Sequence, residues 1–468
     1  MPREPRASMT YEEAVKYLLA LGKELAAPRQ ARVQKFDLEN IRRLARHLGD
    51  PQRKFPSVHI AGTNGKGSTA AMLAAILRQA GLRTGLYTSP HLERINERIA
   101  LDGAPISDDE FARSFTLVRE AIEQLLASGD LAAHPTYFEC LTAMAFEILA
   151  RHSVEMGVLE VGMGGRLDAT NLVVPEVAVI TQIDFDHEDY LGHSIEQIAA
   201  EKAGIIKPGV PLVLAAERPR ARTVIERHAA ELGASVVEID RDFRLEKLRD
   251  DDGWYRGDAV HVESGERFDL APSLAGRHQL RNALAALAAA RILARREGRI
   301  SRSAIERGIA AVRWPARLER FGDSPRIYLD GTHNPAGARE LVNFWDEHFA
   351  GRRIVLVYGA MRDKAVDEIA GLLFPRASAV ILTEPRQSRA ISTPVLHAMT
   401  GHLASECQTL PDPAAAVQRA VECAGPEGIV FITGSLYLAG DLRPVVEQIA
   451  RRTSPGPSSP SSKPPCCD

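Results

Sequence analysis

The sequence is poor in cysteine and lacks both a long apolar segment and an excess of charge of either sign. It has five cysteines in 468 residues, and 58 basic against 61 acidic residues give a net charge of −3. This balance argues against a nucleic-acid-binding surface. No run approaches the roughly 18 apolar residues that cross a membrane, and the N-terminal segment MPREPRASMTYEEA lacks the apolar core of a signal peptide. We therefore expect a cytoplasmic protein that binds neither nucleic acid nor membrane.

The cysteine spacing predicts neither a disulfide framework nor a metal site. Three of them lie far apart without the spacing of metal ligands. Cys466 and Cys467 are adjacent in residues 453–468, a tail made almost entirely of Ser, Pro and Gly. Such a composition cannot bury enough apolar area to offset its chain entropy, so this tail is predicted to be disordered.

Apolar strands alternate with helices along most of the chain. The runs FPSVHIA, EMGVLEVG and EVAVITQID are continuous and apolar, which is typical of parallel strands covered on both faces. Helical segments such as residues 137–151 separate them. Because 468 residues are too many for one core, we predict two α/β domains.

The domain boundary is predicted in RWPARLER, at 313–320, because Pro315 interrupts a segment without apolar periodicity. Residues 1–314 are predicted to form a P-loop domain with a mostly parallel sheet, because they contain the glycine-rich stretch HIAGTNGKGST. It includes a small antiparallel insertion near 235–270, to which we assign SVVEID. Residues 315–452 are predicted to form a smaller Rossmann-like α/β domain.

The stretch HIAGTNGKGST, residues 59–69, has the order strand, glycine-rich loop, helix. Glycines let backbone N–H groups approach phosphate oxygens, and a helix N-terminus adds partial positive charge. Lys66 would reach the terminal phosphates, and Ser68 or Thr69 a bound Mg²⁺. The residues predicted here to bind the phosphates of a nucleotide are Gly62, Thr63, Asn64, Gly65, Lys66, Gly67, Ser68 and Thr69.

This loop departs from the usual phosphate-loop pattern G-x-x-x-x-G-K-[ST] at two places. Ile60 stands five residues before Gly65, where the pattern has glycine, and Gly67 separates Lys66 from Ser68. A tight turn carrying a surface lysine is therefore an open alternative on the pattern alone.

Two side chains are predicted to lie near this loop. Glu160 closes the strand MGVLEVG, and His187 follows the strand EVAVITQID, so both emerge at the carboxyl edge of a parallel sheet, where such sheets bind ligands. A carboxylate and an imidazole could share a divalent ion with the phosphates, since Mg²⁺ uses few protein ligands beside phosphate and water. A capping carboxylate and a hydrogen-bonded loop histidine are the alternatives.

Several motifs follow one another in a distinctive order. Together they closely resemble the folylpolyglutamate synthase/dihydrofolate synthase family, relatives of the Mur ligases, over about residues 10–445. The departures at Ile60 and Gly67 match this family's form of the loop. TSPHL, GGRLDATN and DGTHNPAGA are specific to the folate enzymes. The motifs are GTNGKGS, TSPHL, EVGMGGRLDATN, DHEDYLG, EKAGIIKPG, HQLRNA, RWPARLE and DGTHNPAGA.

The resemblance implies an ADP-forming ligase that activates a carboxylate with ATP as an acyl phosphate and then joins L-glutamate to it. The carboxylate belongs to dihydropteroate or to the glutamate tail of a reduced folate. The resemblance also implies Mg²⁺ and allows a monovalent cation. We expect a monomer, although the sequence itself does not determine the oligomeric state. A cleft closing between two domains would keep an acyl phosphate from water.

The resemblance assigns roles to individual residues. Lysine in EKAG can be carbamylated in this family, which would make Lys202 an anionic ligand of a second Mg²⁺. The catalytic residues so implied are Lys66, Glu160, His187 and Lys202; the metal ligands are Ser89, Glu160, His187 and carbamylated Lys202; further ATP-binding residues are Asn282, Arg317, Asp330 and His333; and the folate-binding residues are Arg166, Leu167 and Asp168.

Three alternatives stay open. RLDATN favours a bifunctional enzyme, because some family members with other residues at the Arg-Leu positions make only polyglutamate; a monofunctional folylpolyglutamate synthase is the alternative. A Mur-type amino-acid ligase and a nucleotide-dependent switch without ligase activity are the others.

Arg166 and Asp168 are expected either to bind the pterin of dihydropteroate or to pair with each other and hold the loop.

Overall fold

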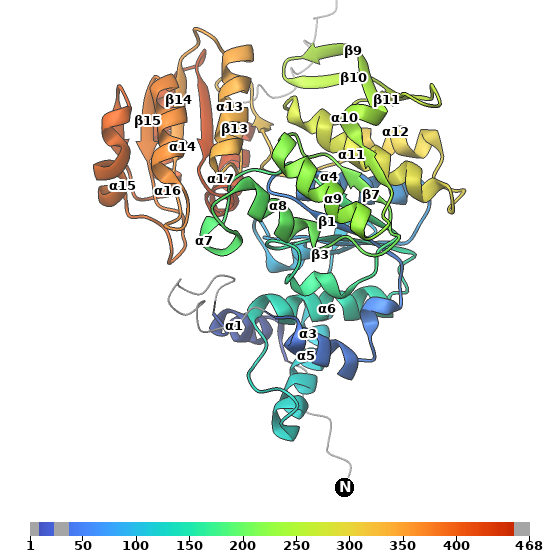
Figure 1. Ribbon diagram of the computed structural model, residues 1–468. Coiled ribbons are helices and arrows are strands. Elements are labelled where there is room, and N and C mark those ends of the chain that lie inside the picture. The colour runs from blue at the N-terminus through green and yellow to red at the C-terminus, as the bar shows by residue number, and fades with distance from the viewer. Residues whose placement is uncertain (1–8, 23–36, 454–468) are drawn as a thin grey trace, which may run out of the picture. The chain divides into compact units, whose positions relative to one another are not determined.

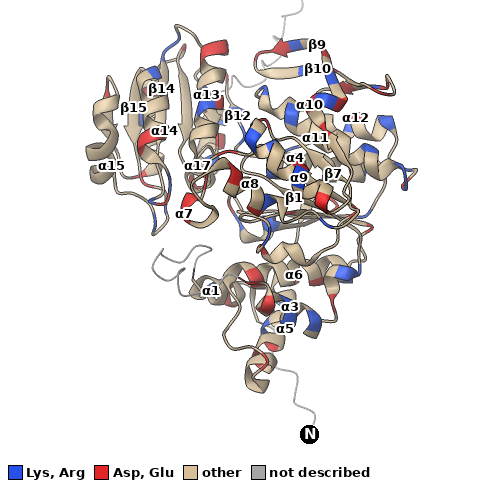
Figure 2. Cartoon of the chain, viewed as in Figure 1, with Lys and Arg blue, Asp and Glu red and all other residues tan. Residues whose placement is uncertain are grey.

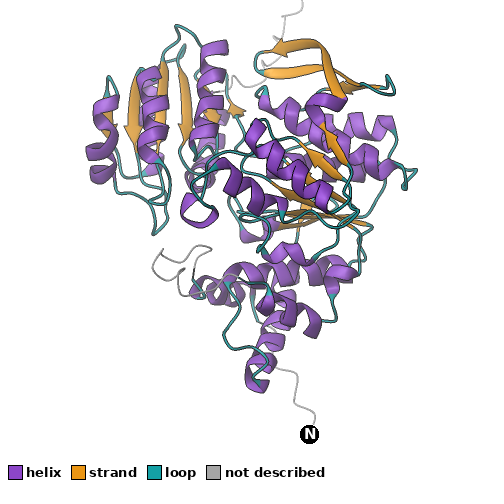
Figure 3. Ribbon diagram, viewed as in Figure 1, coloured by secondary structure: helices purple, strands orange, loops and turns teal. Residues whose placement is uncertain are grey.

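The computed structural model describes residues 9–22 and 37–453, and its internal contacts divide the chain into two units after Trp314. The predicted tail lies outside the described residues apart from Thr453, at which the last helix ends. Both units are built of strands and helices (Figure 3), which confirms the α/β class. Acidic and basic residues are interspersed over each unit (Figure 2). Among the described helices, none has the length and apolar character to cross a membrane.

The N-terminal unit contains a sheet of eight strands. These are β1 (Ser57–Ala61), β2 (Thr84–Tyr87), β3 (Ile99–Leu101), β4 (Ala104–Pro105), β5 (Met156–Glu160), β6 (Val177–Ile180), β7 (Leu212–Leu214) and β8 (Val236–Glu238). Their order is β4-β3-β2-β5-β1-β6-β7-β8, and Figure 1 labels β1, β3 and β7 of this sheet. From β2 to β8 all neighbours are parallel, whereas β3 and β4 add an antiparallel edge. The sheet is mostly parallel, as predicted.

Helices cover both faces of this sheet. Successive strand residues point to opposite sides, and both faces carry apolar side chains that must be buried. On β6, Val177 and Val179 pack in one core with α4, α11 and α12, whereas Ala178 and Ile180 pack in another with α8 and α9. The helices are α1 (Tyr11–Ala20), α3 (Glu39–His47), α4 (Lys66–Gln79), α5 (Asp108–Ser128), α6 (Tyr137–Arg151), α7 (Glu188–Leu191), α8 (Ile195–Ala203), α9 (Pro219–Glu231), α10 (Ile239–Asp242), α11 (His278–Ala294) and α12 (Arg302–Ala311).

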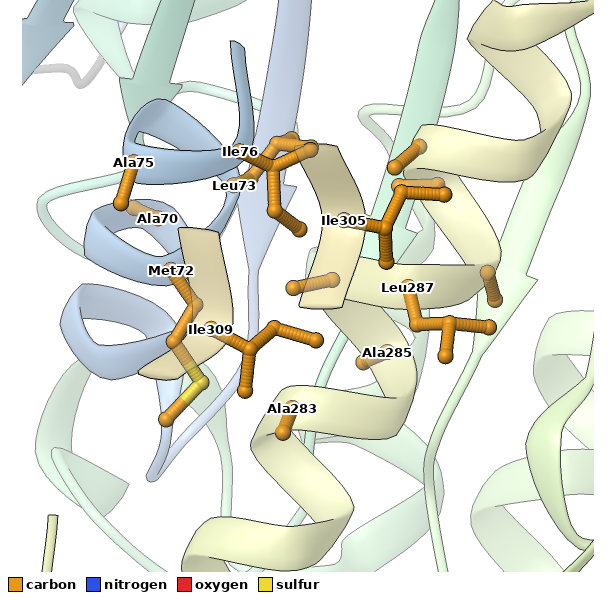
Figure 4. Packing of buried hydrophobic residues seen from close by; sticks show 14 of the residues in the cluster. Ala70, Met72, Leu73, Ala75, Ile76, Ala283, Ala285, Leu287, Ile305 and Ile309 are labelled. Atoms are coloured by element: carbon orange, nitrogen blue, oxygen red, sulfur yellow. The ribbon is translucent and has the colours of Figure 1, made fainter. Parts of the chain in front are cut away.

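The core around α4 fixes the helix that follows the glycine-rich loop. Figure 4 shows Met72, Leu73 and Ile76 of α4 packed with Ile305 and Ile309 of α12. α12 approaches α4 so closely that a Cβ at Gly308 would lie 2.4 Å from the Ile76 Cα. Burial of this apolar surface holds α4, and with it the loop, in place.

The predicted antiparallel insertion is present as a three-stranded sheet of order β11-β10-β9. Its strands are β9 (Phe243–Asp251), β10 (Trp254–His261) and β11 (Arg267–Leu270). The assignment of SVVEID to it is wrong, since β8 pairs in parallel with β7 in the main sheet, Val236 opposite Leu212. A strand of three residues is too short for its sequence pattern to indicate its partner.

The C-terminal unit has a six-stranded sheet of order β12-β13-β17-β14-β15-β16. All neighbouring strands are parallel except β12 and β13, which are antiparallel. This mostly parallel open sheet is the arrangement expected of the smaller α/β domain. The strands are β12 (Glu319–Phe321), β13 (Arg326–Leu329), β14 (Ile354–Tyr358), β15 (Ala379–Leu382), β16 (Cys407–Thr409) and β17 (Ile429–Thr433), and the helices are α13 (Pro335–His348), α14 (Val366–Leu373), α15 (Thr393–Thr400), α16 (Pro413–Ala424) and α17 (Leu436–Thr453).

Candidate active site

The glycine-rich loop joins β1 to α4 at the carboxyl edge of the parallel sheet. A Cβ at Gly62 would lie 1.8 Å from Thr181 Oγ1, and one at Gly65, whose φ is +86°, would lie 2.3 Å from Asn282 Oδ1. No side chain fits at either position. The structure therefore places Asn282 of α11, a predicted ATP-binding residue, directly beside the loop.

Gly67, the glycine that follows Lys66 in the first turn of α4, lies against the ring of Trp314. A Cβ at Gly67 would lie 3.1 Å from the indole Nε1 of Trp314, so glycine leaves room for this ring. The next two residues, Ser68 and Thr69, are buried. Thr69 Oγ1 has no hydrogen-bond partner among the described residues, which leaves a hydroxyl oxygen available beside the predicted phosphate site.

Two lysines converge on one carbonyl of the loop. Lys66 Nζ donates to Gly62 O at 3.1 Å and to Thr63 O at 3.0 Å, and Lys202 Nζ donates to the same Gly62 O at 2.8 Å. Lys202 comes from α8, which packs on β6. The side-chain nitrogens of both predicted catalytic lysines thus lie beside Gly62, at the start of the loop, where positive charge suits phosphate oxygens.

The environment of Lys202 favours its neutral amine. This side chain is buried, and burial together with the positive charge of Lys66 lowers the pKa of Lys202 to about 7. A substantial fraction of Lys202 is therefore uncharged near neutral pH, unlike an ordinary surface lysine.

Glu160 and Ser89 lie together on the strands next to the loop. β5 ends at Glu160 and pairs with β1, with Glu160 opposite Ile60. Ser89 follows β2, and its backbone N–H donates to Glu160 Oε2 at 3.1 Å. The order β2-β5-β1-β6 thus brings both predicted metal ligands to the edge that carries Lys66.

His187 lies on the segment after β6, directly before α7, and its backbone is left-handed, with φ +52°. This segment is tied to the loop because Thr63 Oγ1 donates to Asp184 O at 2.9 Å and accepts from Asp184 N–H at 3.0 Å. Arg218 holds the Asp184 carboxylate with two hydrogen bonds of 2.7 and 2.9 Å. Sequence reasoning missed Asp184 and Arg218, which lie 34 residues apart.

The donor atoms fit a hard divalent cation. Glu160 supplies carboxylate oxygens, Ser89 and Thr69 supply hydroxyl oxygens, and His187 supplies an imidazole, a set that suits Mg²⁺ beside phosphate. No group of three or more His, Cys, Asp or Glu side chains in the described part of the chain forms a metal cage. An ion held here would accordingly depend on hydroxyls and the nucleotide for its remaining ligands.

Asp168 organises the loop GGRLDATN rather than projecting from it. Its carboxylate accepts from Met163 N at 3.0 Å, from Thr170 N at 2.9 Å and from the Thr170 hydroxyl. Because that hydroxyl donates to Asp168, it accepts at 2.8 Å from Nε2 of His59 on β1. Burial raises the pKa of Asp168 and lowers that of His59 to about 3. A histidine within an apolar strand was the available sequence signal for this network.

Arg166 pairs with a carboxylate other than that of Asp168. Its guanidinium pairs with Glu201 of α8 at 2.8 Å, so the expected alternative in which Arg166 and Asp168 pair with each other is wrong. The loop packs tightly on α8, since a Cβ at Gly165 would lie 2.8 Å from Glu201 O. This packing joins the predicted folate loop to the helix that carries Lys202.

In the C-terminal unit, the three predicted nucleotide residues lie around the end of β13. A Cβ at Gly331 would lie 2.6 Å from Arg317 Nη1, and His333 Nδ1–H donates to Gly331 O at 2.8 Å. Asp330 accepts from Leu318 N–H at 2.8 Å. The structure thus brings Arg317, Asp330 and His333 together within this unit.

Comparisons with known proteins agree with these two units. A family model described as Mur ligase middle domain matches residues 60–290, and one described as Mur ligase, glutamate ligase domain, matches residues 316–436. The dihydrofolate synthase/folylpolyglutamate synthase of Bacillus subtilis is 37% identical over 87% of this chain and 94% of its own length. The folylpolyglutamate synthase of Lacticaseibacillus casei is 36% identical over 93% and 98%.

A solved structure extends the likeness to the fold. Mycobacterium tuberculosis folylpolyglutamate synthase complexed with ADP has a TM-score of 0.84 and 32% identity, and the match covers 93% of this chain and 98% of that one. Sequence identity, both Mur ligase domains and the fold agree along nearly the whole chain. The protein therefore belongs to the folylpolyglutamate synthase/dihydrofolate synthase family of Mur-type ligases.

Proposed function

We propose that the protein is an ATP-dependent, ADP-forming ligase that joins L-glutamate through an amide bond to dihydropteroate and to reduced folates. The observation that carries this proposal is the glycine-rich loop with Lys66 and Lys202 on one carbonyl, beside Glu160 and Ser89 on adjacent strands. The names of the relatives support the folate and glutamate substrates. Such a site binds a polyphosphate and neutralises its charge.

The reaction proceeds in two transfers. A carboxylate oxygen of the pterin substrate attacks the γ-phosphorus of ATP, the bond to the β-phosphate oxygen breaks, and ADP leaves an acyl phosphate. The amine of L-glutamate then attacks the acyl carbon, the carbon–oxygen bond to phosphate breaks, and the proton lost by the nitrogen passes to water or to the departing phosphate. Lys66 neutralises the developing charge on the phosphoryl oxygens, and positioning supplies most of the remaining acceleration.

Ser89, Glu160 and His187 are proposed as the residues that hold Mg²⁺. When bound, Mg²⁺ neutralises phosphate charge and orients the phosphoryl group. The backbone N–H of Ser89 on Glu160 Oε2 fixes the carboxylate at the sheet edge, and the contacts of Thr63 with Asp184 fix the segment that carries His187.

Lys202 is proposed to react with carbon dioxide. Its neutral amine adds to CO₂ and one proton leaves, which converts R–NH₂ to the carbamate R–NH–COO⁻. As an ammonium, Lys202 would repel a cation, whereas the carbamate oxygens are metal ligands like those of Glu160. The pKa of about 7 supports this role, because only the uncharged amine reacts.

The remaining residues are proposed to bind the other parts of the substrates. Asn282 and Arg317 contact the nucleotide, Arg317 through a guanidinium fork suited to phosphate. Asp330 and His333 belong to the same nucleotide-binding group. Neither is proposed as the general base that deprotonates the glutamate amine.

The folate side is proposed to involve the loop GGRLDATN. Arg166 and Leu167 contact the pterin substrate, and Asp168 gives the loop its shape, since its carboxylate oxygens accept from Met163 and Thr170. Retention of RLDATN supports activity on dihydropteroate as well as on reduced folates.

An isotope experiment tests this function and its intermediate together. The enzyme is incubated with ATP, L-glutamate and a reduced folate whose reacting carboxylate carries ¹⁸O. We expect a folate lengthened by one glutamate, ADP, and phosphate that carries one ¹⁸O atom. Product formation without label in phosphate would contradict the acyl phosphate, and absence of any lengthened folate would contradict the function.

A further inference from the structure

The segment that leads into the C-terminal unit has a strained backbone on both sides of Arg317. Ala316 and Leu318 are not glycines, yet their φ values are +55° and +49°. Both are buried. Left-handed conformations are unfavourable for residues with a Cβ, and they persist only where surrounding contacts impose them.

Three backbone hydrogen bonds impose this conformation. Ala316 N–H donates to Glu319 Oε2 at 2.9 Å, and Leu318 N–H donates to Asp330 Oδ2 at 2.8 Å. Ala316 O accepts from Gly331 N–H at 2.9 Å. Two carboxylates therefore hold the amides on either side of Arg317, and charge-assisted bonds of this kind are stronger than those between neutral groups.

Arg443 of α17 in turn holds the first of these carboxylates. Its Nε lies 3.1 Å from both Oε1 and Oε2 of Glu319, and its Nη2 lies 2.9 Å from Oε1. Both side chains are less than one quarter exposed, at 24% and 22%. A forked and mostly buried pair of this kind holds a carboxylate more firmly than an exposed ion pair does. Arg443 therefore fixes the position at which Glu319 accepts from Ala316 N–H.

The strained segment determines where the Arg317 guanidinium lies. Arg317 Nη1 donates to Ala316 O at 3.0 Å and occupies the space over Gly331 that a Cβ would fill. If residues 316–318 relaxed to right-handed or extended backbone, the Arg317 side chain would leave from a different direction. Its position beside the end of β13 thus depends on the two carboxylates.

We propose that Arg443, Glu319 and Asp330 are positioning residues that hold Ala316–Leu318 in its left-handed conformation and so present the Arg317 guanidinium to a phosphate of ATP. This inference rests on the proposed contact of Arg317 with the nucleotide. Asp330, which belongs to the proposed nucleotide-binding group, also acts through the backbone of Leu318. Glu319 and Arg443 extend the nucleotide-binding apparatus to residues that do not touch the substrate.

The test is a graded set of variants at Glu319. Glu319→Met removes the acceptor for Ala316 N–H and is expected to raise KM for ATP about 10-fold, with KM for the folate unchanged. Glu319→Gln keeps one acceptor oxygen and is expected to give a smaller rise. Glu447→Gln is the matched control, because Glu447 is a second carboxylate on Arg443, at 3.0 Å, and it also pairs with Arg451 of the same helix at 3.8 Å.

A glycine substitution separates positioning from a simple loss of stability. Glycine adopts positive φ without the cost that a Cβ imposes, so Ala316→Gly in the Glu319→Met background is expected to restore part of the affinity for ATP. A purely structural role predicts that KM for ATP recovers only as far as urea unfolding shows that stability recovers, since glycine at positive φ also relieves strain in the folded chain. A raised KM for ATP in a Glu319→Met variant that is fully folded under the assay conditions supports positioning, whereas a normal KM in that folded variant overturns it.

Two further results distinguish failure of this inference from failure of the proposed function. If Arg317→Ala leaves KM for ATP unchanged, the proposed contact of Arg317 with ATP is wrong. If Arg317→Ala raises KM for ATP but Glu319→Met and Arg443→Met behave like Glu447→Gln, the positioning inference is overturned. Should Arg443→Met fail to fold, Glu319→Gln, which keeps the size of the side chain, decides.

Discussion

Depleting carbon dioxide should inactivate the enzyme if Lys202 becomes a carbamate, as we propose. Burial and Lys66 lower the pKa of Lys202 from 10.5 to about 7. At about pH 7.5, an amine of the ordinary pKa is neutral in roughly one molecule in a thousand, whereas at a pKa of about 7 roughly three in four are neutral. The reactive amine is therefore enriched several hundred-fold by the fold.

Carbon-13 NMR with labelled bicarbonate detects the modification directly. We expect one carbamate signal in the parent enzyme, its loss in Lys202→Ala, and its persistence in Lys207→Met. Lys207 is the matched control, because burial also lowers the pKa of its amine, which donates to Asn171 Oδ1 at 2.8 Å. Activity measured in CO₂-free buffer should fall and should return when bicarbonate is added.

Two results would refute this reasoning. A carbamate signal that survives in Lys202→Ala would place the modification on another amine. Activity that is the same in CO₂-free and bicarbonate-containing buffer, without any carbamate signal, would leave Lys202 as a lysine that only donates to Gly62 O.

Further predictions concern single substitutions. Lys66→Ala should lower kcat by about 10²-fold or more with its fold intact by circular dichroism; near-normal turnover would remove Lys66 from the phosphate site. Glu160→Gln should require more Mg²⁺ for half-maximal activity, and an unchanged Mg²⁺ titration would place the metal elsewhere. Asp168→Ala should lower kcat/KM for dihydropteroate and for tetrahydrofolate in parallel, because it loosens the whole loop; a loss confined to dihydropteroate would indicate a direct pterin contact. In CO₂-free buffer the parent's stability should rise between about pH 7 and 10.5, because there the unfolded chain binds the proton that folded Lys202 has lost; urea unfolding of Lys202→Met should lack this rise.

Much of the fold follows from apolar patterns within short windows. The helix predicted at 137–151 has those bounds as α6, and the apolar runs before Gly62, at Glu160 and before His187 are parallel strands. β8, β12 and β16 have three residues each. In so short a strand, pairing partners that are distant in the sequence decide the structure, which explains why SVVEID was assigned to the wrong sheet.

The residues of the site could be named from motifs, but their contacts could not. Lys202 and Gly62 lie 140 residues apart, and no local pattern indicates that their atoms meet. The same holds for His59 with Thr170, 111 residues apart, and for Arg443 with Glu319, 124 residues apart. Such contacts depend on how sheets and helices pack, so they become visible only in the folded chain.

The central claim is tested most directly by ADP formation over a panel of acceptors. Purified enzyme with ATP, Mg²⁺ and L-glutamate receives dihydropteroate, a reduced monoglutamyl folate, a UDP-muramoyl acceptor or no acceptor. We predict glutamate-dependent ADP release with both pterin substrates, each lengthened by one glutamate by mass spectrometry, and none with the other two. ADP release that needs the UDP-muramoyl acceptor, or that is the same without any acceptor, would contradict a folate ligase.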